Sequence, residues 1–476
     1  MTLTAQLTAA ARGASRDDSP DAADSPRDTW PAPLRQAAYH GVFGAVIKAI
    51  EPETEADPAA ILLQILAMFG SVIGRTAHYR VEADVHYLML NVGVVGNTAK
   101  GRKGISRGRA QRLFEPVDPE WTRECITSGL SSGEGLIHHV RDPIEKEHPI
   151  KKNGRVTGYE TVVEDPGVDD KRLLVIESEL ASTLKTMSRD GNTLSAVVRQ
   201  AWDGHDLRTL TKSSSTKATA PHIGIIGHIT RDELRRYLDA TECANGFGNR
   251  SLWVCVRRSK ELPDGGRPVD LTWCSDDIQA AVTAAKNVTE MRRDTDARSL
   301  WHQVYGRLSA GRPGLLGAMT ARAEAQVMRL ACLYALGDRL DVVRVPHLRA
   351  ALEVWRYCFD STAYIFGDRL GDPVADEILN ALRAAAPESL TRKEISHVVL
   401  GKNRSSAEIT RALTMLLESR LARFEKDRSG EGRPAERWFV EVIRPNDLND
   451  LIACEPGIGR IGRQVVDGDD NDAYRT

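Results

Sequence analysis

The chain has few cysteines, and their spacing does not suit metal or disulfide chemistry. Seven occur in 476 residues, with no CxxC pair and no nearby quartet of cysteine and histidine. Structural zinc sites need about four such ligands at short spacings, and disulfide frameworks belong to oxidising compartments. The sequence therefore argues against both and favours a reducing, cytoplasmic location.

Long hydrophobic runs are also missing. The most apolar helical segment, residues 59–74, contains Gln64 and is shorter than the roughly 20 residues that cross a bilayer. The N-terminal residues lack the apolar core of a signal peptide. We therefore expect no membrane association. The formal net charge is only −2, so a nucleic-acid partner has to be argued from local patches and not from the total.

What the chain does contain is enough apolar material for a large core. With 476 residues, 41% of them hydrophobic, its length predicts two to four domains. The first 28 residues are rich in Ala, Ser, Asp and Pro and predict a disordered leader. We expect a helical region at 29–87, an α/β core at 88–275, a helical lid at 276–371, a winged helix at 372–445 and an acidic tail at 446–476.

Residues 88–106, LMLNVGVVGNTAKGRKGIS, predict a strand, a glycine-rich loop and the start of a helix. The apolar residues 88–95 suit a strand that is buried on both faces. The glycines allow several N–H groups to face one anion, lysine and arginine surround them, and a helix N-terminus would point at the same place. This is the layout of a phosphate-binding loop. Its candidate nucleotide-binding residues are Gly96, Asn97, Thr98, Ala99, Lys100, Gly101, Arg102, Lys103, Gly104 and Ser106.

The loop departs from the usual pattern, GxxxxGK followed by Ser or Thr, in which the hydroxyl binds Mg²⁺. One extra residue lies between Gly96 and Lys103, and Gly104 stands where the hydroxyl is expected. Ser106 is the nearest hydroxyl after the lysine, and Thr98 is an upstream alternative. A basic surface turn would have a similar composition, so the pattern alone leaves both interpretations open.

Two later apolar runs end on polar residues. Residues 173–176 lead directly to Glu177, with Glu179 two residues later. A hydrophobic strand that ends in an acid is typical of a Walker B element, whose carboxylate lies beside the phosphates and Mg²⁺. The second run, HIGIIGHIT, ends near His228 and Thr230. In ring-forming P-loop ATPases a polar sensor residue there contacts the γ-phosphate or the attacking water; His228 is the first candidate, and a histidine satisfied at a strand end is the alternative.

Two arginines are candidates for catalysis. Arg250 follows the glycine loop NGFGN and precedes an apolar strand, a position that resembles an arginine finger reaching the γ-phosphate in a neighbouring subunit. The second candidate is Arg322, in an apolar helix at 320–336, where Arg329 lies seven residues later on the same side. A core helix with solvated arginines would have the same pattern.

Two charged segments lie beside these motifs. The helix that continues from Ser106 carries Arg107, Arg109 and Arg112, either as a solvated face or as a contact with nucleic acid. Residues 143–171 are polar and charged, which predicts a surface hairpin inserted between core strands.

After the linker signal Gly-Asp-Pro at 371–373, three helices are predicted at 374–385, 391–399 and 405–420, followed by two strands around the turn SGEGRP. Three helices and a β-ribbon form a winged helix-turn-helix. Residues 389–444 contain 12 Lys/Arg and 8 Asp/Glu, a net +4, which favours DNA contact over protein docking. The third helix should bury Ile409, Leu413, Leu416 and Leu417. The candidate DNA-binding residues are Lys402, Arg404, Arg411, Arg433 and Arg437.

Taken together, VGNTAKGRKGIS, SGLSSGEGL, LLVIESELA, GHIT, GFGNR and TARAEAQVMRLACLYAL resemble a bacterial and phage family of P-loop ATPases, domain of unknown function 3987, over residues 35–370. Its members occur near or fused to primases on mobile elements and are similar to RecA/AAA-type ring ATPases. The resemblance implies ATP and Mg²⁺ as cofactors, Lys103 as the phosphate lysine, Glu177 as the Walker B acid and a homo-oligomeric ring. The helix at 320–336 also resembles the sensor-2 helix of minichromosome-maintenance helicases, which implies a role for Arg322.

The resemblance implies an ATP-dependent motor that acts on DNA, either a replicative-type helicase or a replication-initiation ATPase of a mobile element. No primase motif is recognisable, so priming would come from a separate protein. The alternative is a DNA-binding regulator or partition-type module that uses nucleotide as a switch. Glu177 separates the two, because a motor needs a positioned catalytic acid whereas a switch works with slow hydrolysis.

Overall fold

A computed structural model describes residues 30–97, 101–152, 155–210, 216–238, 240–312, 314–367, 369–427 and 435–441. The expected leader and acidic tail lie outside these residues. Within the described part of the chain, no helix has both the length and the apolar character needed to span a bilayer. The six described cysteines are buried and carry free thiols, in agreement with the expectation that they form no disulfide framework.

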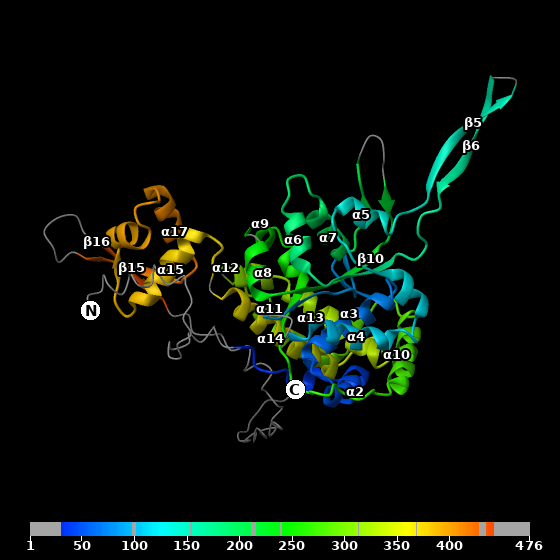
Figure 1. Cartoon of the computed structure of the whole chain (residues 1–476), viewed down its shortest axis with the longest axis horizontal. Coiled ribbons are helices and arrows are strands. Elements are labelled where there is room, and N and C mark those ends of the chain that lie inside the picture. Colours follow the sequence, from blue (N-terminus) through cyan, green and yellow to red (C-terminus); the bar gives the residue numbers. More distant parts are fainter. Residues whose placement is uncertain are drawn as a thin grey trace, which may run out of the picture.

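A five-stranded, fully parallel sheet forms the centre of the larger body, which confirms the expected α/β class (Figure 1). Its strands are β3 (Asn91–Val95), β4 (Ile126–Thr127), β7 (Arg172–Glu177), β10 (His222–Ile229) and β11 (Ser251–Cys255). They lie in the order β11-β3-β10-β7-β4. The chain leaves β3 towards β4 but leaves β10 towards β11, and the helices that follow these two neighbouring strands, at 103–114 and 231–237, lie on opposite faces of the sheet. In parallel sheets, ligands bind at such a point.

The two faces of the sheet belong to two hydrophobic cores, because successive strand residues point to opposite sides. Val92 and Val94 face the larger core, and Val95 and Trp253 face the smaller one. Trp253 packs directly over Gly93, where a Cβ atom would come within 2.2 Å of the indole ring. Glycine at 93 therefore lets β3 and β11 pair without displacing this tryptophan.

Helices cover both faces. The larger core receives α2 (Gly41–Ile50), α3 (Pro58–Val72), α4 (Lys103–Phe114), α10 (Thr272–Ala285), α11 (Thr295–Leu308), α13 (Ala323–Gly337) and α14 (Val345–Phe366). The smaller core receives α5 (Gly133–His138), α6 (Leu180–Met187), α7 (Leu194–Trp202), α8 (Arg231–Tyr237), α9 (Ala240–Ala244) and α12 (Gly314–Thr320).

The helix α3 is central to the larger core. It starts as expected, because Asp57 accepts a hydrogen bond from the Ala59 N–H and Pro58 occupies the first turn. Residues 59–72 are all buried. A helix that is apolar on nearly every side needs partners all around it, and here the larger core supplies them.

Three hairpins extend the body: β1 (His78–Val81) with β2 (Asp84–Tyr87), β5 (Ile144–Lys152) with β6 (Arg155–Asp165), and β8 (Leu207–Arg208) with β9 (Lys217–Ala218). The β5–β6 pair is the hairpin expected within residues 143–171. A short parallel pair joins β12 (Arg292–Arg293) to β13 (Val342–Val343). Short helices lie at η1 (Gln36–Ala38), η2 (Glu51–Glu53), η4 (Trp121–Cys125) and η5 (Gly248–Arg250).

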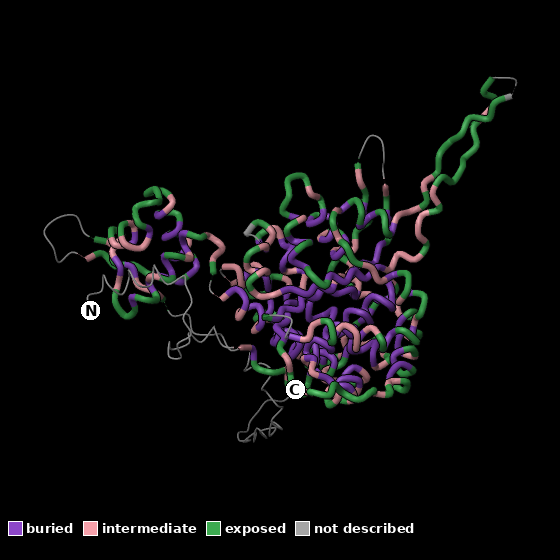
Figure 2. Tube along the Cα trace, viewed as in Figure 1, coloured by how far each residue is buried: buried purple, intermediate pink, exposed green. Residues whose placement is uncertain are grey.

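The C-terminal residues form a second body with its own hydrophobic core, visible as a separate buried centre in Figure 2. Its elements are α15 (Pro373–Ala385), β14 (Leu390–Thr391), α16 (Arg392–Glu394), η6 (Ile395–Val399), α17 (Ser406–Glu418), β15 (Ala422–Asp427) and β16 (Ala435–Val440). The strands pair in the order β14-β16-β15.

One detail of the predicted core of α17 is wrong. Leu417 is 40% exposed, and Ala412 is buried beside Leu413 and Leu416 instead. Spacings of three and four residues follow one helix face, and Leu417 lies at the flank of the stripe that Ile409 begins.

Candidate functional site

The glycine loop begins where β3 ends. The Gly96 N–H donates to the Ile229 carbonyl (3.1 Å), and the Val256 N–H donates to the Val95 carbonyl (2.8 Å). These bonds tie the start of the loop to the ends of both neighbouring strands. A Cβ atom on Gly96 would lie 3.2 Å from the Val256 carbonyl oxygen, which is a tight approach. Thr98, Ala99 and Lys100 lie outside the described residues.

The two cations after Gly101 point to different partners. Arg102 adopts the left-handed conformation (φ 53°) before α4, and its Nε lies 2.6 Å from Glu55 Oε2. Lys103 Nζ instead donates to the Gly96 carbonyl (3.2 Å), across the loop. Burial lowers the pKa of Lys103, an effect that Glu233 opposes. Lys103 is therefore the cation that lies over the loop, at the first residue of α4.

Glu177 ends β7 and is held by backbone groups. Its Oε1 accepts hydrogen bonds from the Gly129 N–H (2.7 Å) and the Leu130 N–H (2.6 Å), in the loop after β4. Both bonds go to the same oxygen, so Oε2 has no hydrogen-bond partner among the described residues. Glu179 is exposed. The carboxylate that fits a ligand at this edge is thus that of Glu177, already oriented.

His228 belongs to a buried network. The ring is 3% exposed, and its Nε2 lies 3.1 Å from Gln64 Oε1. The Gln64 amide nitrogen donates to the Ala60 carbonyl (3.0 Å) and to Ser106 Oγ (2.7 Å), so the amide oxygen faces His228, which donates to it. Burial, followed by the charges of Lys103 and Arg107, lowers the pKa of His228 to about 4. The ring is neutral at pH 7.

This network corrects two expectations. Ser106 is fully buried, and its hydroxyl donates to the Lys103 carbonyl (2.7 Å), on the side of α4 that faces α3. It therefore cannot serve as the magnesium ligand at the outer edge. His228 is likewise occupied with Gln64 and covered, so the structure does not support its direct contact with a γ-phosphate. In the sequence, Gln64 was noted only as a polar residue that interrupts an apolar segment. A buried polar residue needs hydrogen-bond partners, so this interruption was the one sign of the network.

Other polar residues close the same edge. Arg107, on α4, donates to Ser178 Oγ (3.1 Å), the residue after Glu177. Thr230, the second sensor candidate, caps α8: its hydroxyl accepts from the Glu233 N–H (3.3 Å) and donates to the Glu233 carboxylate (2.8 Å). α4 and the ends of β7 and β10 therefore meet at one place.

The structure contradicts Arg250 as a finger reaching another subunit. Its side chain is 8% exposed, and Nη2 lies 2.7 Å from Asp203 Oδ2. Nη1 donates to the Gly246 carbonyl (2.8 Å). The acidic partner comes from the end of α7 and not from its own loop, a contact that only the fold creates.

Arg322 and Arg329 lie in the same region, at the amino ends of the strands. Arg329 is 1% exposed, so the alternative of a core helix with solvated arginines does not hold for it; it donates to the Met89 and Trp202 carbonyls and lies 3.6 Å from the Trp202 ring centre. Arg322 lies 5.0 Å from the same ring centre and 3.7 Å from Asp203. These arginines are thus far along the strands from Lys103 and Glu177.

A cleft of about 560 Å³ lies beside the glycine loop. Asn97 and Gly101 line one side. The opposite side is formed by Trp30, Val256, Arg257, Arg258, Ser259, Lys260 and Glu261. The Arg257 guanidinium lies 5.2 Å from the Trp30 ring centre. Sequence reasoning missed this wall because all of its residues except Trp30 follow β11, about 150 positions after the loop.

One group of side chains in the described residues has the spacing of a metal site: His40, Asp338 and His347. His347 Nδ1 accepts a hydrogen bond from the Arg344 N–H (2.9 Å), so its proton is on Nε2, which donates to Asp338 (3.1 Å). His40 Nε2 lies 2.7 Å from the same carboxylate oxygen. The lone pair that a metal would need on His347 is therefore not available, and the group joins α2 to α14.

The cations predicted to contact DNA lie on the surface of the C-terminal body, several of them beside acids. Arg411 lies 2.8 Å from Asp372, Arg437 lies 2.8 Å from Asp427 and Arg404 lies 3.7 Å from Glu408. Lys402 is exposed just before α17, and Arg433 lies outside the described residues. The structure thus brings Lys402, Arg404 and Arg411 to one region and leaves Arg437 on β16.

No protein-family model matches the chain, and no curated protein matches it significantly.

Proposed function

We propose that the chain is an ATP hydrolase that acts on DNA, as a replicative-type helicase or a replication-initiation ATPase of a mobile element. The observation that carries this proposal is the arrangement at the carboxyl edge of the sheet. The Gly96 loop and Lys103 follow β3, Glu177 ends β7, and β10 lies between these two strands. A RecA/AAA-like core, as the sequence resemblance implies, would use this edge for the nucleotide.

In this proposal the phosphates of ATP lie between the glycine loop and Glu177. Lys103 leaves the Gly96 carbonyl and contacts the β- and γ-phosphates, where its charge stabilises the transition state. Glu177 keeps its Oε1 on the two amides and uses Oε2 to hold Mg²⁺ or to orient the attacking water. Mg²⁺ would neutralise phosphate charge, and the free Oε2 is a donor that fits it. Because Ser106 is buried, no hydroxyl of α4 is assigned to the metal.

His228 has an indirect role in this proposal. It is a positioning residue that acts through Gln64 and Ser106, since this chain of hydrogen bonds joins the end of β10 to the first turn of α4. Any displacement of β10 would thereby be transmitted to the helix that carries Lys103.

DNA is the proposed partner of the C-terminal body. Its element order, with three helical segments followed by the β15–β16 pair, supports a winged helix, and Lys402, Arg411 and Arg437 are among its exposed cations. A homo-oligomeric ring and a separate primase remain proposals that rest on the resemblance, since Arg250 no longer supports an active site shared between subunits.

The first test compares the two cations of the loop. Lys103→Ala should reduce ATP turnover by at least about 100-fold, because a preorganised charge at the phosphates is lost. Arg102→Ala is the matched control: it removes a neighbouring cation that is paired with Glu55 and should change turnover only a few-fold. Steady-state phosphate release measures both. Equal turnover in Lys103→Ala and the parent would refute the assignment of the loop.

The alternative function, a DNA-binding regulator or partition-type module with nucleotide as a switch, uses the same site for slow hydrolysis. A strand-displacement assay with a forked duplex separates the two. Unwinding that requires ATP and is lost in Lys103→Ala supports the motor; ATP-dependent changes in DNA affinity without unwinding support the switch.

A further inference from the structure

The β5–β6 hairpin extends away from the rest of the molecule (Figure 1). Its strands have nine and eleven residues and pair along their whole length. Most of the hairpin is exposed, as Figure 2 shows, and this includes apolar side chains: Tyr159 is 64% exposed, Val156 50% and Ile150 44%. A two-stranded ribbon with open edges and apolar side chains in water is marginally stable and prone to self-association. Such a feature indicates a binding element.

The root of the hairpin is firmly held. Arg141 donates two hydrogen bonds to Asp165, from Nε (2.6 Å) and from Nη2 (2.8 Å). Lys171 Nζ donates to the Arg141 carbonyl (2.6 Å) and pairs with Asp142 (3.0 Å). These bonds fix the direction of the ribbon relative to the sheet, so it can present its tip to a partner at a defined place.

Charge is divided between the tip and the root. Residues 149–159, PIKKNGRVTGY, contain Lys151, Lys152 and Arg155 and no acid. All five acids of the hairpin lie in the root half, where Glu164 pairs with Lys146 (2.6 Å) and approaches His148 (3.6 Å). Lys151 and Arg155 are exposed and form no ion pair with any described residue. The tip is therefore a cationic end on a stem in which acids outnumber basic side chains.

A second hairpin has the same character and begins at the same place. Among the described residues of this β8–β9 hairpin, Arg208 and Lys217 are exposed and none is acidic. Asp142, at the root of β5, donates its N–H to the Lys217 carbonyl (2.7 Å) and accepts from the Thr219 N–H (2.9 Å). Arg208 and Leu210 are exposed on this hairpin, Leu210 to 88%.

We propose that the described residues on both sides of the β5–β6 turn, Ile150, Lys151, Arg155, Val156 and Tyr159, form a binding surface for single-stranded nucleic acid. Cations without acidic partners suit phosphates, and exposed Tyr159, Ile150 and Val156 between them offer surfaces on which unpaired bases stack. Bases inside a duplex are stacked on one another, so they would have to unstack before they could stack on these side chains. The inference rests on the proposed function in that the captured strand would be the one the motor acts on.

The test measures binding to a fluorescent oligo(dT) by anisotropy, with the full chain, at several salt concentrations. Lys151→Ala/Arg155→Ala should weaken binding about tenfold and reduce the slope of log affinity against log salt by about 1.4, since each single-strand phosphate contact contributes about 0.7. Tyr159→Ala should weaken binding about tenfold with little change in slope, because it removes stacking and no charge. Affinity for a duplex of the same length should stay within about twofold of the parent.

The matched control is Lys146→Ala/His148→Ala, which alters the same strand in the root half, where both side chains lie close to Glu164. This variant should leave oligo(dT) affinity unchanged. Circular dichroism and DNA-independent ATP hydrolysis should match the parent in every variant, because each substituted side chain is exposed on the hairpin. Unchanged oligo(dT) affinity and salt slope in the tip variant would overturn the inference; so would equal losses for duplex and single strand. The parent could also bind oligo(dT) through the tip and yet show no ATP hydrolysis. That result would support the binding surface and would refute the proposed ATPase.

Discussion

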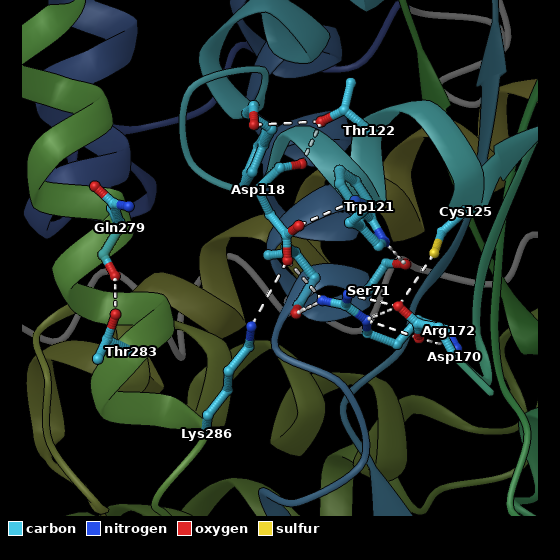
Figure 3. A network of polar contacts seen from close by, with 12 residues as sticks. Ser71, Asp118, Trp121, Thr122, Cys125, Asp170, Arg172, Gln279, Thr283 and Lys286 are labelled. Atoms are coloured by element: carbon cyan, nitrogen blue, oxygen red, sulfur yellow. Dashed lines mark hydrogen bonds and ion pairs between the residues drawn. The ribbon is translucent and has the colours of Figure 1, made fainter.

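The two edges of the central sheet treat charge in opposite ways. At the amino edge, charged side chains form ion pairs with one another. Arg172 lies between Asp118 (2.9 Å) and Asp170 (2.6 Å), and it also donates to the Val72 carbonyl (2.8 Å). Figure 3 shows these side chains beside Trp121 and Ser71. At the carboxyl edge, Lys103 and Glu177 are held by backbone groups instead. Paired charges stabilise a fold, whereas a charge oriented by the backbone remains able to bind an oppositely charged ligand.

The largest effect should come from removing the charge at the amino edge. Arg172→Met should lower the free energy of unfolding by about 3 kcal/mol, because it leaves Asp118 and Asp170 without their partner in a half-buried place. Chemical denaturation measures this. Arg123→Met is the control, since its pair with Glu124 is mostly exposed and contributes less than about 1 kcal/mol. A loss as small as that of the control would show that the network in Figure 3 does not support the sheet.

The same substitution should change the response to acid. Burial alone would raise the pKa of Asp118 and of Asp170, but hydrogen bonds, including those from Arg172, outweigh it and lower both. A lowered carboxyl pKa stabilises the fold above the unfolded value of about 4, and this contribution is lost as the pH falls through the folded value. The decline in stability below about pH 4 should therefore be steeper in the parent than in Arg172→Met.

An intermediate effect should appear at the carboxyl edge. Glu177→Gln retains an oxygen for the amides of Gly129 and Leu130 but replaces the free Oε2 by a neutral NH₂ group. ATP turnover should fall about 100-fold, with the affinity for ATP changed only a few-fold in the presence of Mg²⁺, because the acid acts in the transition state. Single-turnover kinetics and equilibrium nucleotide binding measure the two. Stability should remain close to that of the parent; a loss as large as in Arg172→Met would show that both edges serve structure.

The last effect concerns His228 and appears only on acidification. Because its pKa is lowered to about 4, the folded protein takes up no proton there between about pH 6.5 and 4, whereas the unfolded chain does. The free energy of unfolding should decrease in this range by up to about 1.4 kcal/mol per pH unit from this group. In His228→Gln the slope should be shallower by that amount. An unchanged slope would mean that the ring is charged in the folded state.

Patterns local in sequence predicted the strands well. Continuous apolar runs around Gly93 and Gly227, and the acid at the end of residues 173–177, were sufficient to place β3, β7 and β10, because such a run is typical of a strand that is buried on both faces. Capping at Asp57 and the hairpin within residues 143–171 followed from the same short-range chemistry. The assignments of side-chain partners were less accurate, since a helix has several faces and the sequence does not state which element covers each.

By itself the sequence determined the α/β alternation, the position of the glycine loop after a buried strand and the acid at the end of another, all of which depend on periodicity and on the backbone freedom of glycine. Only the tertiary structure decided that Ser106 turns inward to Gln64, that Arg250 pairs with Asp203, and that Lys103 and not Arg102 lies over the loop. The first two contacts join residues that are between about 40 and 50 positions apart in the sequence. The third depends on the direction in which α4 starts, which places the side chain of one cation over the loop and turns its neighbour away. Tertiary packing decides which partner each of these side chains contacts, and a short sequence pattern contains no information about that packing.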